Sequence, residues 1–224
     1  MRDLDLSPPA EGHKSAKGRS TKSIILKAAL EIFIEHGYGE FSIQKVAARC
    51  TLSRGNVSYH YPTRDDLLHG MVDAVLQGYI DDFDDIAKDA GLSAAEKFVS
   101  IIEMIMSDLG TKETSVFFPE LWALSNHNQY ALAEMNKMYQ RARAHLIELI
   151  GAINPALTQN DRELVGVFIS ASIEGHTPFV GPGKEWEKSL PKLTNIAAFS
   201  FLHLAKSVTK NDIATMRKGL KLAS

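Results

Sequence analysis

Hydrophobic residues recur along most of the chain with the spacing of buried helix faces. In the first such segment they occupy positions i, i+1, i+4, i+5, i+8 and i+9, which form one stripe along a helix. The stripe consists of Ile24, Ile25, Ala28, Ala29, Ile32 and Phe33. Gly37 follows it, and a glycine just beyond the last helical turn is a common C-cap. The pattern predicts a first helix that begins near Thr21 or Lys22 and ends at about His36.

Two short amphipathic segments come next, separated by three residues. The first predicts a helix over Ile43–Cys50, with Ser42 as its N-cap. The second predicts a helix over Arg54–Tyr59, with Ser53 as its N-cap. Thr51-Leu52-Ser53 separates the two, and short helices joined by such a turn form a helix-turn-helix.

The remaining pattern is also helical, and stretches with glycine and proline divide it. A long helix is expected after Thr63, because its hydroxyl and the acidic residues that follow suit a helix N-terminus. Further helices are expected over Ser93–Leu109, Thr114–Ser125, Gln129–Ile150, Thr158–Gly175 and Glu185–Val208. No stretch alternates polar and apolar residues for long enough to predict a strand. The pattern therefore predicts an all-α chain, in which a three-helix helix-turn-helix domain precedes a larger helical domain.

Four parts are expected along the chain. Residues 1–20 are polar, contain prolines and glycines, and predict a disordered basic arm. Residues 21–66 form the helix-turn-helix domain, residues 67–209 the larger domain and residues 210–224 a tail. The single Cys50 excludes a disulfide framework. No apolar run approaches the roughly 18 residues that span a bilayer, and the N-terminus lacks the apolar stretch of a signal peptide, so a cytoplasmic location is expected.

Charge is distributed unevenly, although the formal net charge is only −2. From His13 to Arg64 the chain has nine lysines and arginines and three glutamates, a local net charge of +6, which leaves about −8 for the remainder. A basic head on an acidic body suits a protein whose head binds nucleic acid, because phosphates attract the first and repel the second. The alternative is a chance fluctuation of charge.

The helix-turn-helix has one apolar face and one hydrogen-bonding face. The residues expected to form its core are Val46, Ala47, Leu52, Val57 and Tyr61, packed against Ile25, Ala29 and Phe33. The other face of the second helix presents Arg54, Gly55, Asn56, Ser58, Tyr59 and His60. In a major groove, arginine can bond guanine and asparagine can bond adenine, each through two hydrogen bonds. This face predicts a DNA-reading element, with an ordinary polar surface as the alternative.

Residues 22–70 resemble the DNA-binding domain of the TetR family of one-component bacterial regulators. The family pattern has a glycine–aromatic pair, a threonine or serine before the second helix, an Ile/Val-Ala pair, a Gly-Val-Ser turn, Gly-x-Leu-Tyr-Tyr-His-Phe and Lys-x-x-Leu. This chain has Gly37-Tyr38, Ser42, Val46-Ala47, Leu52-Ser53, Gly55-Asn56-Val57-Ser58-Tyr59-His60-Tyr61-Pro62, and Arg64 with Leu67-Leu68. With so many elements at fixed spacing, the segment is identified as a member of the family.

Three positions depart from the family pattern. Thr51 stands where the turn usually has glycine, and a positive φ there would be unfavourable for threonine. Ser58 replaces the first tyrosine of the pair, which removes a large phosphate or base contact. Tyr61 replaces phenylalanine and adds a hydroxyl. These departures leave the DNA-binding role intact and the half-site sequence open.

The resemblance implies a set of DNA-facing residues. They are Ser42, Lys45, Arg54, Asn56, Ser58, Tyr59, His60 and Arg64. On chemical grounds Arg54 and Asn56 are the expected base readers. Phosphate contacts are expected from Ser42, Tyr59, His60 and Arg64. Loose backbone or minor-groove contacts are expected from Lys14, Lys17 and Arg19 in the arm.

The resemblance further implies that the later helices form a ligand pocket and a dimer interface. The candidate pocket residues are Met104, Phe117, Phe118, Trp122, Tyr130, Phe168, His176 and Phe179. Walls of this kind suit a small, largely apolar ligand, with plain core packing as the alternative for each residue. The last two long helices have broad apolar faces, and a homodimer formed through them would read two DNA half-sites.

The predicted function is a sequence-specific transcriptional regulator, namely a repressor released from a double-stranded DNA operator by a small apolar effector. A second hypothesis is a helical enzyme, but the chain has no nucleophile elbow, no phosphate loop and no metal-binding spacing among its eight histidines. The protein is therefore expected not to be an enzyme, and no cofactor or metal is expected. A third hypothesis is a DNA-binding protein without a small ligand, or an activator.

Overall fold

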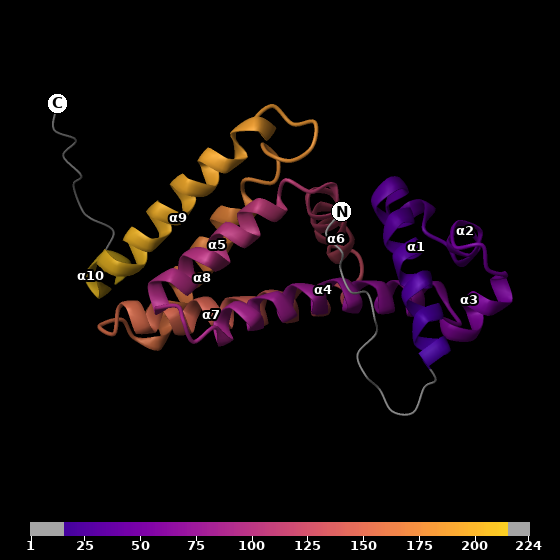
Figure 1. The fold of residues 1–224 in the computed structure, drawn as a ribbon, viewed down its shortest axis with the longest axis horizontal. Coiled ribbons are helices and arrows are strands. Elements are labelled where there is room, and N and C mark those ends of the chain that lie inside the picture. The colour runs from indigo at the N-terminus through magenta and orange to yellow at the C-terminus, as the bar shows by residue number, and fades with distance from the viewer. Residues whose placement is uncertain (1–15, 215–224) are drawn as a thin grey trace. The chain divides into compact units, whose positions relative to one another are not determined.

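The computed structural model describes residues 16–214, with side chains from residue 21 onward, and all regular structure in this range is helical (Figure 1). The elements are α1 (Ala16–Glu40), α2 (Ile43–Arg49), α3 (Arg54–His60), α4 (Arg64–Lys88), α5 (Ala94–Asp108), α6 (Lys112–Ser125), α7 (Gln129–Ile153), α8 (Gln159–Glu174), η1 (Glu187–Ser189), α9 (Leu190–Ser207) and α10 (Lys210–Ala214). The all-α prediction is confirmed. Within the same range, no helix combines the length and apolar character needed to cross a membrane.

The observed helix boundaries correct the sequence prediction at several places. The first helix, predicted to end at about His36, continues in α1 to Glu40 with a non-helical Gly37 inside it. Residues 16–20, predicted as part of a disordered arm, are the first residues of α1, because a polar first turn has no apolar stripe to reveal it; residues 1–15 lie outside the described part. The helix predicted to begin at Glu185 begins at Leu190, since Pro191 belongs in a first helical turn. Residues 210–214 of the predicted tail are helical, and residues 215–224 are not described.

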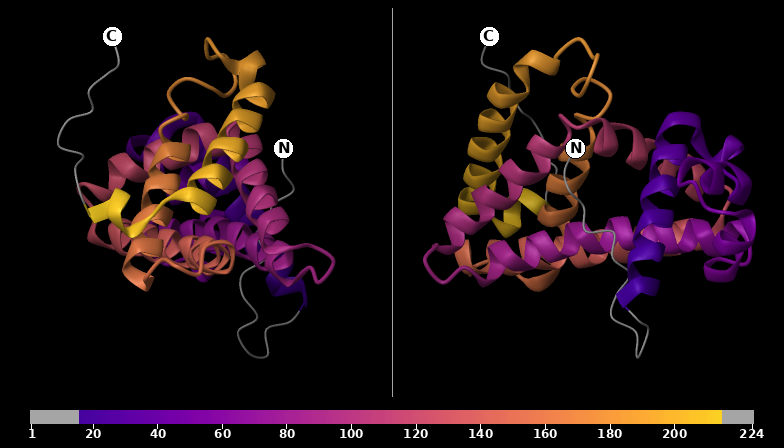
Figure 2. Two further views of the ribbon diagram at one scale, coloured as in Figure 1. Left: turned by 90° about the vertical axis from the view of Figure 1, so that its left-hand side faces the viewer. Right: turned by 45° about the vertical axis from the view of Figure 1, so that its right-hand side comes forward.

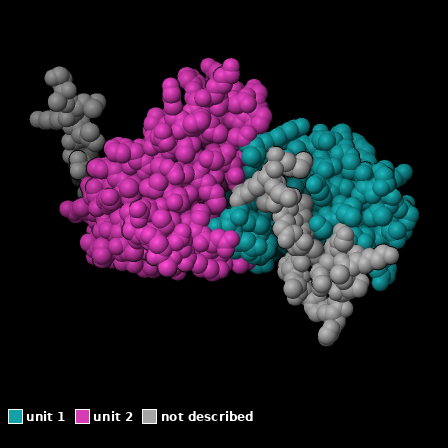
Figure 3. Space-filling view, viewed as in Figure 1, with its two compact units in different colours: residues 1–82, 111–140 teal, residues 83–110, 141–224 magenta. Residues whose placement is uncertain are grey.

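The chain divides into two compact units (Figure 3). Unit 1 comprises residues 1–82 and 111–140, and unit 2 comprises residues 83–110 and 141–224. Helices α4 and α7 each contribute residues to both units. The predicted boundary between residues 66 and 67 lies in the first turn of α4, and α6 packs with the helix-turn-helix, so the compact units differ from the predicted domains.

Unit 1 is built around α1, which packs against α2 and α6, while α2 packs against α3. Phe33 of α1 is fully buried among these helices. The centroid of its ring lies 6.1 Å from that of Phe41 and 5.7 Å from that of Phe117 in α6. Aromatic pairs at this separation stabilise a core beyond the area that they bury. One apolar core therefore joins the helix-turn-helix to α6.

Unit 2 is built around α9, which packs against α5 and α8 (Figures 1 and 2). Its buried residues include Phe98, Ile101, Ile102 and Met106 of α5, Val165, Ile169 and Ile173 of α8, and Ala197, Phe201 and Ala205 of α9. The side-chain amide of Asn154 fixes the end of α9, donating to the carbonyls of Ala205 at 3.1 Å and Val208 at 3.0 Å. The amide satisfies carbonyls that a helix C-terminus otherwise leaves to solvent.

Candidate nucleic-acid interface

Serine hydroxyls define where both short helices begin. Ser42 Oγ accepts a hydrogen bond from the backbone N–H of Lys45 at 3.3 Å, and Ser53 Oγ accepts one from the backbone N–H of Asn56 at 3.1 Å. Each bond satisfies an amide that the first turn of a helix cannot pair internally. Both predicted N-caps are confirmed.

The apolar face of the helix-turn-helix is buried as predicted. Its innermost residues, each at most 4% exposed, are Ile25, Ala29, Phe33, Val46, Ala47 and Val57. Leu52 is half-buried and Tyr61 is buried. Burial also raises the pKa of Tyr61 to about 12. A Cβ at Gly70 would lie 2.6 Å from the Tyr61 ring, so the glycine makes room for this tyrosine.

The turn between α2 and α3 contains a strained residue. Thr51 has a φ of 55°, and no other non-glycine residue in the described part of the chain has a positive φ. A β-branched side chain is especially unfavourable in this left-handed region. The Thr51 hydroxyl donates a hydrogen bond to the carbonyl of Cys50 at 2.8 Å, which offsets only part of the steric cost of the positive φ. The positive φ that would be unfavourable for threonine is therefore present at this position.

We expect Thr51→Gly to raise the free energy of unfolding by about 1 kcal/mol, because glycine adopts a positive φ without a steric penalty. Urea unfolding followed by circular dichroism measures this change. Thr51→Ala is the matched control, since alanine keeps a Cβ in the same conformation and should recover much less. Equal stability of the glycine and alanine variants would contradict the account of strain.

The exposed face of α3 carries the predicted base readers. Arg54 and Asn56 are exposed, as is Tyr59, whose side chain is 83% accessible. Ser58 and His60 are half-buried, and the His60 ring meets that of Tyr59 edge-on at 5.1 Å. Within residues 21–214 Arg54 forms neither a hydrogen bond nor an ion pair, so its guanidinium is available to a ligand.

Two of the predicted DNA-facing cations have partners inside the protein. Lys45 Nζ forms an ion pair with Glu40. The Arg64 guanidinium stacks on Tyr38, with Cζ 3.9 Å from the ring centroid, and donates through Nη2 to the Tyr38 carbonyl. Ser42 uses its hydroxyl as a cap and is half-buried. The structure therefore leaves Arg54, Asn56 and Tyr59 exposed on α3 and places Arg64 in an internal contact.

Sequence reasoning missed the role of Arg49 in α2. Its guanidinium bonds two glutamates of α1, Glu31 at 3.2 Å and Glu35 at 2.6 Å. The hydrogen bonds from Arg49 also hold the pKa of Glu35 below its usual value. The signal was present as two acidic residues one helical turn apart on α1, which can share one arginine. Arg49 thus ties α2 to α1 and neutralises acids that would otherwise repel phosphate.

Four of the predicted pocket residues lie in unit 1. Phe117 and Phe118 are buried. Trp122 is half-buried, and its Nε1 donates to the hydroxyl of Tyr139 at 3.0 Å. Tyr130 donates to Asp73 at 3.1 Å and stacks on a histidine of α4. Phe117, Phe118 and Trp122 form an aromatic cluster on α6, which the hydrogen bond to Tyr139 extends to α7, whereas Tyr130 contacts α4. A ligand role for the four predicted residues stays a prediction.

The other four lie in unit 2. Met104 is half-buried, while Phe168 and Phe179 are each 58% exposed. His176 is half-buried and donates through Nδ1 to the carbonyl of Ser172 at 2.8 Å. Phe168 and Phe179 are therefore exposed aromatic residues in a single chain, and a ligand role for this set also stays a prediction.

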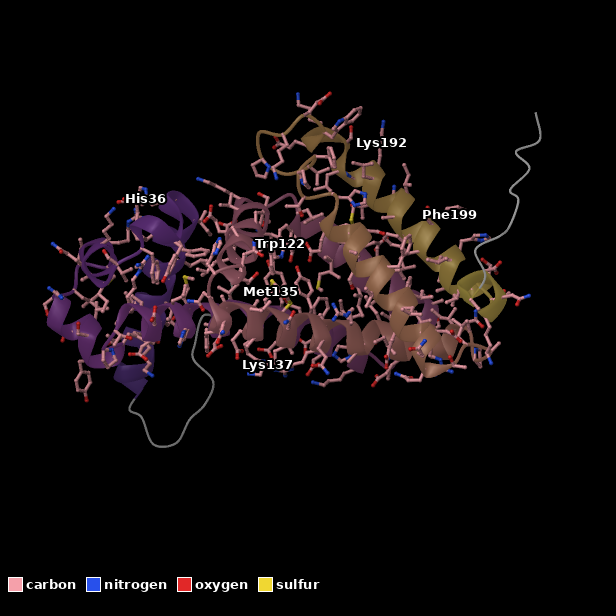
Figure 4. All side chains as sticks on the ribbon, turned by 180° about the vertical axis from the view of Figure 1, so that it is seen from behind. His36, Trp122, Met135, Lys137, Lys192 and Phe199 are labelled. Atoms are coloured by element: carbon pink, nitrogen blue, oxygen red, sulfur yellow. The ribbon has the colours of Figure 1, made fainter. Side chains whose placement is uncertain are left out.

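Helices α8 and α9 each have a second apolar face that is exposed. On α8 the exposed residues are Leu164, Val167 and Phe168, which are 50%, 48% and 58% accessible. On α9 they are Ile196 and Phe199, which are 61% and 75% accessible (Phe199 is labelled in Figure 4). In both helices these positions follow i, i+3 or i+4 spacing, so they form stripes opposite the buried residues. We call these five residues the α8–α9 apolar face.

Comparison with known proteins supports the same segment as the functional one. Residues 25–71 match the family described as "Bacterial regulatory proteins, tetR family". A curated relative, the uncharacterized HTH-type transcriptional regulator YuxN of Bacillus subtilis (strain 168), is 30% identical over 54 residues. That alignment covers 24% of this chain and 19% of the relative, so the likeness is confined to about a fifth of the relative's length.

Solved structures resemble almost the whole chain in fold. A TetR transcription regulator from Haloarcula marismortui ATCC 43049 is 20% identical with a TM-score of 0.66, and the match covers 83% of this chain and 96% of that one. The transcriptional regulator FadR from Bacillus subtilis, solved in complex with stearoyl-CoA, is 18% identical with a TM-score of 0.62, covering 82% and 97%. At these identities the likeness establishes the fold.

Proposed function

This chain belongs through its N-terminal domain to the TetR family of bacterial regulatory proteins, and on that premise we propose that it is a sequence-specific DNA-binding transcriptional regulator. The observation that carries the proposal is the exposed face of α3. There the Arg54 guanidinium has no partner within residues 21–214, and Asn56 of the same helix is also exposed. Arginine and asparagine are the side chains that distinguish guanine and adenine in the major groove.

Backbone contacts would orient α3 on the duplex. Tyr59 and His60 lie at the end of α3 next to the base readers, and both can donate hydrogen bonds to phosphate oxygens. Ser42 can add a contact at the start of α2. Lys45 would need to leave Glu40 to bind phosphate, so we assign it a smaller share of the affinity. The proposed reading unit is therefore centred on Arg54, Asn56 and Tyr59.

Selection of bound duplexes from a random-sequence pool tests the proposed function. If the chain reads bases, one short sequence should become enriched over successive rounds at a salt concentration near 150 mM. A purely electrostatic binder would retain DNA at low salt without enriching any sequence, because phosphate contacts carry no base information. A bound pool that stays random would therefore overturn the proposal.

The α8–α9 apolar face supports a homodimer as the DNA-binding form. Helices that are apolar on two faces need a partner for each, and in a single chain the second face remains exposed to water. A second copy of the chain offers the same face, so a two-fold arrangement can bury both. A dimer would also place two copies of α3 on successive half-sites, which doubles the DNA sequence that is read.

We also propose that a small, largely apolar effector releases the protein from its operator. The aromatic cluster of α6 and α7 supports this idea, and α6 packs directly on α1 of the helix-turn-helix. FadR of Bacillus subtilis was solved with stearoyl-CoA, which makes acyl-CoA thioesters suitable first probes. An effector that binds one conformation better would shift the chain toward that conformation.

We expect at least one probe with an apolar acyl chain, from a panel of acyl-CoAs and free fatty acids, to raise the melting temperature and to weaken operator binding. Thermal shift and mobility-shift titration measure the two effects on the same protein. By linkage, operator DNA should weaken probe binding by the same factor. If every stabilising probe left operator affinity unchanged, the proposed release by effector would be wrong; if none stabilised the protein, a regulator without a small ligand would be favoured.

A further inference from the structure

The contact between Arg64 and Tyr38 closes the segment that contains the helix-turn-helix. Tyr38 lies near the end of α1, and Arg64 is the first residue of α4. Between them run α2, the turn and α3, so the two residues mark the two ends of the predicted DNA-reading segment. One side chain therefore links these ends across 26 positions of sequence.

The geometry of this contact uses most of the arginine side chain. The guanidinium carbon lies 3.9 Å from the centroid of the Tyr38 ring, which is a close cation–π contact. Nη2 donates to the Tyr38 backbone carbonyl, which also accepts the N–H of Phe41 at 3.2 Å. Nε is buried and has no hydrogen-bond partner within the described range. The stack on Tyr38 and the Nη2 bond thus hold the guanidinium against the protein, while a purely phosphate-binding arginine would extend into solvent.

The surrounding backbone is shaped for the contact. Gly37 has a φ of 67° and a ψ of 177°, so the chain leaves the helical path immediately before Tyr38. A Cβ at position 37 would also lie 3.1 Å from Glu120 Oε2 of α6, so this carboxylate would have to shift slightly to admit another residue. At the other end, Thr63 and Asp66 cap α4 reciprocally, at 3.0 Å for each backbone N–H. Both partners of the contact therefore start from fixed backbone positions.

We infer that Arg64 is a positioning residue, which holds α3 for DNA reading through Tyr38 and does not bind phosphate. The inference rests on the proposed DNA-binding function. It differs from the role that the resemblance implies for Arg64, which is an outward phosphate contact. Arginine suits the contact because its planar guanidinium can stack on the tyrosine ring and donate a hydrogen bond to the carbonyl at the same time, whereas lysine offers only a point charge.

The experiment compares Arg64→Lys, Tyr38→Leu and the double variant on a duplex selected from random sequence by the unaltered protein. We expect each single variant to lose about tenfold in affinity, equivalent to roughly 1.4 kcal/mol, and the double variant to lose little more than Arg64→Lys. The slope of log affinity against log salt should stay unchanged in all three, since no phosphate contact is removed. Tyr38→Phe, which keeps the ring and the carbonyl, should bind like the unaltered protein.

A phosphate contact gives the opposite results. Arg64→Gln would then reduce the salt slope by about one per subunit, Arg64→Lys would keep most of the affinity, and Tyr38→Leu would bind normally. Lys27→Gln, which removes one exposed charge from α1, controls for the loss of charge alone. A reduced salt slope for Arg64→Gln, together with near-normal binding by Arg64→Lys and Tyr38→Leu, would overturn the inference.

Thermal melting of the same variants tests the contact without DNA. Coupling between Arg64→Lys and Tyr38→Leu in a double-mutant cycle is expected, and its absence would refute the contact itself. If the unaltered protein selects no duplex, the proposed function fails, while the coupling measured by melting still decides whether the contact exists. Binding is compared at a temperature at which circular dichroism shows each variant to be folded.

Discussion

Phe199→Glu should convert the protein from a dimer to a monomer and abolish tight binding to its selected DNA site. Phe199 is 75% exposed in a single chain and is the most exposed residue of the α8–α9 apolar face. In the proposed dimer the substitution would bury one unpaired carboxylate from each subunit, at a cost of several kcal/mol for each charge. Light scattering coupled to size exclusion at micromolar concentration measures the oligomeric state.

Leu132→Glu is the matched control for this experiment. Leu132 is also an exposed apolar residue, at 41% accessible, but it lies on α7 and outside the α8–α9 apolar face. The control should remain dimeric and bind DNA normally. If Phe199→Glu remained dimeric, or if the unaltered chain were monomeric, the interface would have to lie elsewhere or the protein would act as a monomer.

Arg54→Ala should remove most of the preference for the selected site. A paired hydrogen bond between arginine and guanine contributes about 1–3 kcal/mol of discrimination, and a dimer makes the contact twice. Because Arg54 has no ion pair within residues 21–214 and is exposed, its loss should leave the stability of the fold nearly unchanged. Mobility-shift titrations on the selected and a scrambled duplex measure the ratio of the two affinities.

Lys27→Ala serves as the charge control, because it removes one exposed cation from α1. It should affect both duplexes alike, as expected of any contribution to general attraction. If Arg54→Ala also weakened both duplexes by the same factor, Arg54 would be a phosphate contact, and base reading would rest with Asn56 or another residue.

Features that depend on neighbouring residues could be predicted from the sequence. Ser42 and Ser53 were identified as caps because an N-cap bond joins a side chain to an amide three residues later. The strain at Thr51 followed from its place in a turn where glycine is usual. The buried face of the helix-turn-helix followed from helical spacing, since Val46 and Val57 are apolar and both are fully buried.

Features that depend on residues far apart in the sequence could not be predicted in this way. Arg49 and Glu35 are 14 positions apart, and Arg64 and Tyr38 are 26 apart. Each pair forms only because two helices fold onto one another, and a list of basic residues cannot show which of them are already paired. The charge of the head segment therefore agrees with the proposed role but does not show which cations face DNA.

The packing of α6 onto α1 also lay beyond the sequence pattern. Phe33 and Phe117 both read as core residues, but periodicity assigns a residue to a buried face without naming the helix that covers it. Because of this contact, unit 1 includes residues 111–140, which the predicted domain boundary assigned to the larger domain. It also places the proposed effector region in direct contact with the helix-turn-helix core.

The most direct test of the central claim is the symmetry of the DNA that the unaltered protein selects from a random pool. The account predicts an inverted repeat whose half-sites are centred about one helical turn apart, or a multiple of it, each containing a base step read by Arg54 and Asn56. Sequencing the bound pool measures this. A pool without any enriched sequence, or with a single unrepeated site, would contradict the proposal that two copies of α3 read DNA together.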